Sequence, residues 1–327
     1  MAYLLRGLAA NGGLRIIAAD TTDLVEEVRK RHSASPTATA ALGRSLGGAL
    51  LLSHVLLKNP QDRLTLRFRS NGPIGGIIAD GGLDGSVRGY ALNPDVQLPP
   101  REDGKLDVGG AIGQGDLEVI RSHAPYGDPY SSSVKLVNGE VAEDIAMFLA
   151  QSEQIGSAVM LGVYLENGGV ARSGGVLVQA LPDAEDAALT LLEANVKALG
   201  QLTDAMSRMS LLEVLHELCW GLEFELLTQD ALPLRFECRC SDEKALEALA
   251  YFSPEEREEM IAQDGGAEAV CHWCSEKRWL DPEQLRSISG EEIRCPECNT
   301  LWYREGQNTM IREQEKCACG REVSLPS

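Results

Sequence analysis

The sequence predicts an α+β fold that continues into a helical segment and a small cysteine-rich region. Three observations predict it: short β-rich runs separated by glycine turns, helical stretches between those runs, and eight of nine cysteines placed in pairs after Phe236. The chain has 327 residues, of which 44% are apolar and 24% charged. This length and composition favour two folded domains and a connection over a disordered chain.

The first 180 residues combine both kinds of secondary structure. Alternating β-rich runs bounded by glycines lie at residues 64–69, 75–79 and 86–91. Apolar residues recur at helical spacing at residues 23–31, 37–58 and 142–154. We therefore expect residues 1–180 to form a mixed sheet-and-helix domain.

A helical linker is expected at residues 181–236. Pro182 and Asp183 form a helix-start signal, and the pattern beyond them is purely helical. Two apolar stripes follow, one through Leu189, Leu192, Val196 and Leu199 and the other through Leu211, Leu212, Leu215, Leu218 and Leu222. These faces need a cover. Either they simply pack on the first domain, or that cover can be withdrawn.

The charge of the chain is acidic and unevenly distributed. Its net charge is -19, with -3 on residues 1–180 and -16 on the remainder. An acidic field repels phosphate backbones, so we expect no nucleic-acid partner. The same field favours the solubility of an opened C-terminal region.

The hydrophobic runs of the chain are short. The N-terminal residues lack the uninterrupted apolar core of a signal peptide, and the longest apolar run, near residues 47–57, falls short of the ~20 residues that a membrane span needs. We therefore expect a cytoplasmic protein without a membrane partner. In a reducing cytosol, nine cysteines are more often metal ligands or redox-active thiols than resting disulfides.

Eight cysteines form four pairs with metal-ligand spacing. The pairs are Cys238 and Cys240, Cys271 and Cys274, Cys295 and Cys298, and Cys317 and Cys319. Both C-x-C in an extended segment and C-x-x-C in a tight turn present two sulfurs to one ion, and a redox-silent zinc ion suits such all-thiolate sites. Grouping neighbours predicts one zinc at the first four cysteines and a second at the last four. A swapped grouping stays open, as does a purely structural role for the metal.

The other candidates for chemistry are weaker. Cys219 lies alone on an apolar helical face and is interpreted as a packing residue. His272 stands between two cysteines, but four thiolates leave it no place as a ligand. Gly43-Arg-Ser45-Leu-Gly47 matches the G-x-S-x-G hydrolase pattern, yet a helix-like run surrounds Ser45 where a strand-to-helix elbow is required. The sequence therefore predicts no catalytic residue and no enzyme.

Several ordered segments carry a resemblance to a known family. They are residues 42–45 (L-G-R-S), 71–75 (N-G-P-I-G), 87–90 (V-R-G-Y), 139–144 (G-E-V-A-E-D), 152–154 (S-E-Q), 174–179 (G-G-V-L-V-Q), 238–241 (C-R-C-S) and 271–274 (C-H-W-C). Together they resemble the thirty-three-kilodalton heat-shock chaperone family, the redox-regulated holdases, over about residues 1–285. The remaining segment, residues 288–327, departs from the family pattern and looks like a zinc-ribbon extension.

The resemblance implies a function and a site. It implies an ATP-independent holdase for unfolded or misfolded client proteins, with a zinc-bound redox switch at residues 237–287 held by Cys238, Cys240, Cys271 and Cys274. The reduced form is inactive. Oxidation forms the disulfides Cys238–Cys240 and Cys271–Cys274, releases zinc, unfolds the linker and yields a homodimer.

Two alternatives remain at this point. A zinc-ribbon adaptor for other proteins would use the same cysteines without a switch. A thiol-disulfide oxidoreductase would use C-x-x-C directly, but four cysteine pairs without a thioredoxin-like βαβ setting favour metal.

Overall fold

The computed structural model describes residues 1–123, 129–227, 230–288, 291–294 and 301–304. The chain divides into two compact units, Met1–Cys238 and Arg239–Ser327. None of the described helices is both long and apolar enough to cross a membrane. The α+β prediction is confirmed.

Two sheets form the framework of the first unit. The strands of the first sheet are β1 (Tyr3–Ala9), β2 (Leu14–Asp20), β8 (Ser157–Glu166), β9 (Gly169–Ala180), β10 (Glu225–Leu226) and β11 (Leu232–Pro233). Those of the second are β3 (Arg63–Ser70), β4 (Ile77–Gly82), β5 (Ser86–Ala91), β6 (Gly115–Ser122), β7 (Tyr130–Lys135) and β12 (Arg235–Phe236). The first sheet runs β10-β1-β2-β9-β8 with β11 also on β1, and the second runs β12-β5-β4-β3-β6-β7.

Helix α2 (Pro36–Leu56) lies between the two sheets and makes contacts with strands of both. Ser35 begins it, because its side chain accepts a hydrogen bond from the backbone N–H of Ala38, and Pro36 occupies its first turn. The helix is buried on nearly all sides, and Gly43 lets neighbours come close: a Cβ there would lie 2.7 Å from a methyl group of Val25. This helix and the inner faces of both sheets make the main core.

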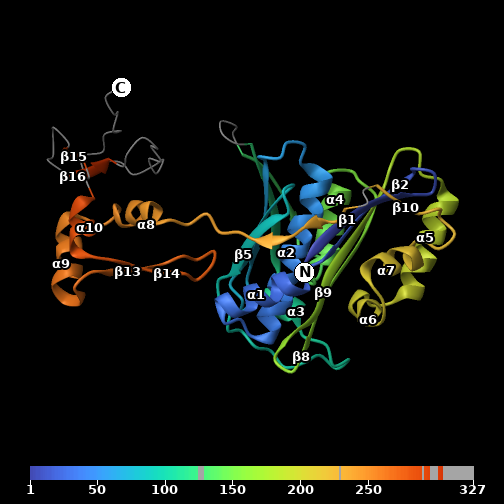
Figure 1. Ribbon diagram of the computed structural model, residues 1–327, viewed down its shortest axis with the longest axis horizontal. Coiled ribbons are helices and arrows are strands. Elements are labelled where there is room, and N and C mark those ends of the chain that lie inside the picture. Colours follow the sequence, from blue (N-terminus) through green and yellow to red (C-terminus); the bar gives the residue numbers. More distant parts are fainter. Residues whose placement is uncertain (124–128, 228–229, 289–290, 295–300, 305–327) are drawn as a thin grey trace. The chain divides into compact units, whose positions relative to one another are not determined.

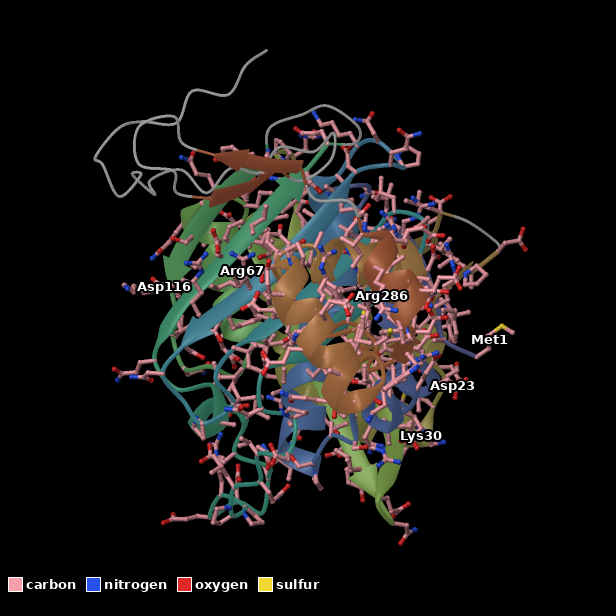
Figure 2. All side chains as sticks on the ribbon, turned by 90° about the vertical axis from the view of Figure 1, so that its left-hand side faces the viewer. Met1, Asp23, Lys30, Arg67, Asp116 and Arg286 are labelled. Atoms are coloured by element: carbon pink, nitrogen blue, oxygen red, sulfur yellow. The ribbon has the colours of Figure 1, made fainter. Side chains whose placement is uncertain are left out.

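The other helices before residue 180 complete this core. They are α1 (Thr22–His32), α3 (Val108–Ile112) and α4 (Ala142–Gln151). The N-terminus is tied to α1 by an ion pair of 2.5 Å between the Met1 amine and Asp23, both labelled in Figure 2.

A second core lies on the opposite face of the first sheet. Helices α5 (Asp186–Leu199), α6 (Leu202–Arg208) and α7 (Leu211–Leu218) cover this face (Figure 1). The sheet contributes Leu5, Leu14, Ile16, Val176 and Val178, and the helical segment contributes Leu192, Leu202, Met206, Leu211, Val214, Leu215, Leu218 and Leu222. Side chains alternate between the two faces of a strand, so one sheet serves both cores. The apolar stripes of the expected linker are thus covered, by the first sheet and by the packing of α5 against α7, except that Leu212 is exposed.

The described residues between Leu218 and Cys238, 219–227 and 230–237, form no helix, which corrects the expectation of a purely helical linker. Gly221 takes a left-handed backbone (φ 76°) beyond the end of α7, and three two-residue strands follow. β10 and β11 pair with β1, and β12 pairs in parallel with β5. The open edges of β1 and β5 offer backbone hydrogen bonds that helical periodicity does not reveal.

The second unit is built from short elements. Its described helices and strands are α8 (Asp242–Leu249), α9 (Pro254–Asp264), β13 (Ala267–Val270), β14 (Lys277–Leu280), α10 (Pro282–Ser287), β15 (Glu291–Arg294) and β16 (Leu301–Arg304). Ser241, Ser253 and Asp281 cap the three helices at their N-termini through side-chain oxygens. β13 pairs with β14 and β15 with β16, both antiparallel.

Candidate metal site

The C-x-C pair lies where a strand gives way to a helix. Cys238 follows β12, whose neighbour Glu237 donates its N–H to the carbonyl of Val87 at 3.0 Å. Cys240 precedes Ser241, which caps α8 by accepting from the N–H of Lys244. The extended conformation of Ser241 (φ -147°) and the cap fix where the extended segment ends.

The C-x-x-C pair lies in the connection of the β13–β14 hairpin. The carbonyl of Cys271 accepts a hydrogen bond of 2.7 Å from the N–H of Ser275, and Cys271 donates its own N–H to the carbonyl of Glu276 at 2.9 Å. Ser275 has a left-handed backbone (φ 59°), which closes the turn directly after Cys274. This tight turn aims both sulfurs to one side, as expected for such a motif.

The structure brings Cys238, Cys240, Cys271 and Cys274 together. Their Sγ atoms all lie within 4.8 Å of one another, and those of Cys240 and Cys274 are 3.6 Å apart. Four sulfurs at about 2.3 Å from a tetrahedral zinc ion would be about 3.8 Å apart. Cys274 is buried and the other three are half-buried. The donor set and its spacing therefore fit a metal ion.

Charged side chains surround Cys240. Arg278 on β14 donates from Nη2 to the Cys240 sulfur at 3.6 Å, pairs with Glu276 at 3.2 Å, and donates from Nη1 to Asp242. A carboxylate oxygen of Glu276 lies 3.7 Å from the same sulfur. The hydrogen bond to Cys240, followed by the one to Asp242, raises the pKa of Arg278 above its usual range. Arg278 is therefore a permanent cation beside this sulfur.

Sequence reasoning missed Arg278, Glu276 and Asp242. All three lie within four residues of a cysteine in the chain. In a segment as acidic as this one, however, their charge alone does not distinguish them from solvent-facing residues. Only the hairpin register, which places Arg278 opposite Ala269, brings the guanidinium to the sulfur.

The second predicted site lies outside the described residues. Cys295, Cys298, Cys317 and Cys319 all belong to that part of the chain, so a second zinc and its grouping stay predictions.

Cys219 and Ser45, two other residues considered from the sequence, have structural roles. Cys219 is buried in the second core, and burial raises its pKa to about 12, as expected of a packing residue. Ser45 is fully buried within α2 and donates its hydroxyl to the carbonyl of Ala41, which no nucleophile elbow allows. His123 pairs with Asp62 at 3.0 Å, and His216 packs edge-on against Phe224.

The sequence is similar to one protein family and to named proteins of other organisms. The sequence matches the family described as Hsp33 protein over residues 2–281. A protein of Thermus thermophilus, named 33 kDa chaperonin, is 53% identical over an alignment covering 100% of this chain and 98% of the relative. A 33 kDa chaperonin of Deinococcus radiodurans is 49% identical, with 89% of this chain and 99% of the relative covered. The Thermus protein therefore aligns with the C-terminal extension as well.

A solved structure shares the fold. The crystal structure of a 33 kDa chaperonin from Thermotoga maritima superposes with a TM-score of 0.79 and 35% identity, covering 88% of this chain and 97% of that chain.

Proposed function

The chain belongs to the Hsp33 family of chaperones, and from this premise we propose that it is an ATP-independent holdase switched on by oxidation. Its partners are unfolded or misfolded client proteins, which it binds through apolar surface and does not alter covalently. It is a chaperone and not an enzyme.

Zinc is the metal proposed for Cys238, Cys240, Cys271 and Cys274. Four clustered sulfurs fit its tetrahedral preference, and zinc does not itself change oxidation state. When bound, the ion keeps all four thiols deprotonated and stabilises small modules by about 10–16 kcal/mol. The reduced, zinc-bound form is the inactive one.

Oxidation by a peroxide converts the ligands into disulfides. A thiolate attacks one peroxide oxygen and the O–O bond breaks. Hydroxide is released, and the attacking sulfur becomes a sulfenic acid. The neighbouring thiolate attacks this sulfur, displaces hydroxide and forms the S–S bond, so two thiolates are oxidised and one peroxide is reduced. The proposed bonds are Cys238–Cys240 and Cys271–Cys274, each within one motif. Neither disulfide sulfur remains a thiolate ligand.

One observation carries the proposal: a single segment, residues 219–237, connects the helical layer over the second core to the cysteine quartet. The segment between them is held to the sheet edges by strands of only two residues each. If oxidation unfolds the region that follows Cys238, this segment loses its anchor, and α5–α7 can leave the sheet. Both sides of the second core would then face water and could bind unfolding clients.

The test measures zinc content and suppression of client aggregation before and after hydrogen peroxide, at mild heat and without ATP. We expect weak suppression by the reduced protein and strong suppression after zinc is released. If zinc leaves and aggregation is unchanged, the proposal is wrong.

The proposal extends to the second quartet, to assembly and to location. Cys295, Cys298, Cys317 and Cys319 bind a second, structural zinc ion, the oxidised protein is a homodimer, and the protein acts in the cytoplasm without nucleic-acid or membrane partners. A chain truncated before Glu291 should bind one zinc ion and still respond to peroxide. Loss of the response would make the second quartet part of the sensor.

A further inference from the structure

One arginine joins the two cysteine motifs without being a ligand. Arg278 projects from β14, beyond the C-x-x-C turn, and reaches Cys240 of the C-x-C motif at 3.6 Å. It is four residues after Cys274 in the chain but contacts a sulfur 38 residues away. Its side chain is only 21% exposed, so the guanidinium is partly shielded from solvent.

The contacts of Arg278 hold it in place. Asp242, in the first turn of α8, accepts from Nη1, and Glu276 lies 3.2 Å from Nη2. One guanidinium thus connects the C-x-C motif, the helix after it and the hairpin that carries the other motif. The planar fork of arginine suits this arrangement, whereas the single ammonium of lysine cannot reproduce it.

The charge of Arg278 also offsets an unfavourable contact. Glu276 places a carboxylate oxygen 3.7 Å from the Cys240 sulfur. When this sulfur is a thiolate, the two negative groups repel each other. Arg278 contacts both the Cys240 sulfur and the Glu276 carboxylate, so its positive charge offsets this repulsion at the proposed metal site.

We propose that Arg278 is a positioning residue that sets how readily the switch responds to peroxide, by stabilising the Cys240 thiolate as a metal ligand. This deepens the proposed function and rests on it. A metal-bound thiolate is already deprotonated, so a neighbouring cation cannot increase the fraction of Cys240 that is present as thiolate. The cation instead withdraws electron density from the sulfur and lowers its nucleophilicity.

Two consequences follow for the reaction with peroxide. First, removing Arg278 should weaken metal binding by about tenfold or more, the usual effect of losing a partner of a metal ligand. Second, Cys240 should attack the peroxide oxygen faster in its absence, so the sulfenic acid forms more readily at this position. The stoichiometry of the reaction is the same with and without Arg278: the thiolate loses two electrons to the peroxide, and hydroxide is released.

The experiment compares the full chain with Arg278→Gln, Arg278→Lys and a matched control. The control is Arg286→Gln on α10, labelled in Figure 2, which removes a bidentate pair with Glu258 on α9 in the same unit. Zinc affinity is measured by competition with a chromogenic chelator under reducing conditions. Zinc release by hydrogen peroxide is timed, and differential alkylation with mass spectrometry locates the first oxidised cysteine, which separates this quartet from the C-terminal one.

We expect Arg278→Gln to bind zinc about tenfold more weakly, to release it several-fold faster, and to show earlier oxidation at Cys240. Arg278→Lys should fall between it and the unmodified chain, and Arg286→Gln should match the unmodified chain. If Arg278→Gln cannot be loaded with zinc, Asp242→Asn replaces it, with a smaller shift expected in the same direction.

Affinity and release within about twofold of the unmodified chain, or equal changes in Arg286→Gln, would overturn the role of Arg278, since loss of a true partner costs about tenfold or more. A failure of the proposed function looks different, because then peroxide would release no zinc from the unmodified chain at all.

Discussion

The two units of the chain differ in what can stabilise them. The first has two apolar cores, one around α2 and one beneath α5–α7. Among residues 239–288 of the second unit, the buried apolar side chains are Cys274, Leu280 and Leu285. One of these three is itself a candidate metal ligand. The comparison teaches that one chain can join a domain with two apolar cores to a module with few buried apolar side chains, whose clustered cysteines could supply the missing stability by binding an ion.

Typical free energies of side-chain burial and of zinc binding support this interpretation. Full burial of a leucine contributes about 1.5–3 kcal/mol, so two leucines offer far less than the ordering of some fifty residues costs. Zinc binding in small modules contributes about 10–16 kcal/mol. If the quartet holds zinc as proposed, losing the ion should therefore unfold residues 239–288 while the first unit remains folded.

The largest effect is expected from metal removal. A strong chelator under reducing conditions should unfold residues 239–288 and leave the sheets around α2 intact, because only the former depend on the ion. Hydrogen exchange with mass spectrometry, resolved by peptide, measures this. Protection that persists in α8–α10 after zinc is gone would contradict the comparison.

The next effect concerns single cysteines. Cys238→Ser leaves three thiolates, so we expect zinc affinity to fall by more than the roughly 10–100-fold that loss of an outer partner causes, and client binding to appear partly in the reduced state. Cys219→Ser, in the second core, serves as the control and should retain zinc. Zinc content and suppression of client aggregation are measured for both variants in the reduced state. Equal zinc loss in the two variants would disprove the packing role of Cys219.

A smaller effect should come from the second core. Leu215 on α7 is fully buried, so Leu215→Ala should destabilise the helical layer by about 2–5 kcal/mol and raise client binding by the reduced protein. Leu212→Ala, on the same helix but 37% exposed, is the matched control. Peptide-resolved hydrogen exchange of α5–α7 reports the change. Equal deprotection in both variants would mean that the second core does not hold this layer.

The smallest effect is a pH dependence within the first unit. Burial, reinforced by Arg6 and Arg15, lowers the pKa of His54 from 6.5 to about 4. Between these values the unfolded chain binds a proton that the folded chain does not, so the free energy of unfolding should fall as pH drops from about 6.5 to about 4, by at most about 3 kcal/mol. Above about pH 6.5 this contribution is constant.

Urea unfolding of the first unit, with chelator present at every pH so that zinc loss does not contribute, tests this dependence. The variant His54→Gln should show a flatter profile between about pH 6.5 and about pH 4. An unchanged profile in the variant would assign the dependence to other groups.

Much of the fold follows from local patterns in the sequence. Alternation and glycine turns locate β3 and β5 to within a residue or so, and apolar spacing locates α1, α2 and α4 with small errors at their ends. The cysteine spacing identifies the first quartet because C-x-C and C-x-x-C each constrain two sulfurs locally.

What the sequence could not reveal depends on contacts between distant residues. The strands β10–β12 are two residues long, too short for any periodicity, and exist because β1 and β5 offer open edges. Arg278 reaches Cys240 only through the register of a hairpin. How the apolar stripes of α5–α7 are covered also depends on the sheet that they pack against, which lies far away in the sequence.

The edge pairing of β10, β11 and β12 has a consequence for the released state. These strands occupy backbone groups of Tyr3, Leu4, Gly7 and Leu8 on β1, and of Ser86 and Val87 on β5. If the segment detaches as proposed, two lengths of sheet edge lose their partner strands at the same time as the apolar face is uncovered. An unpaired edge can add any extended peptide as a new strand through main-chain hydrogen bonds, whatever its side chains. Recognition of this kind does not discriminate between sequences, which suits a protein that must hold many different unfolding chains.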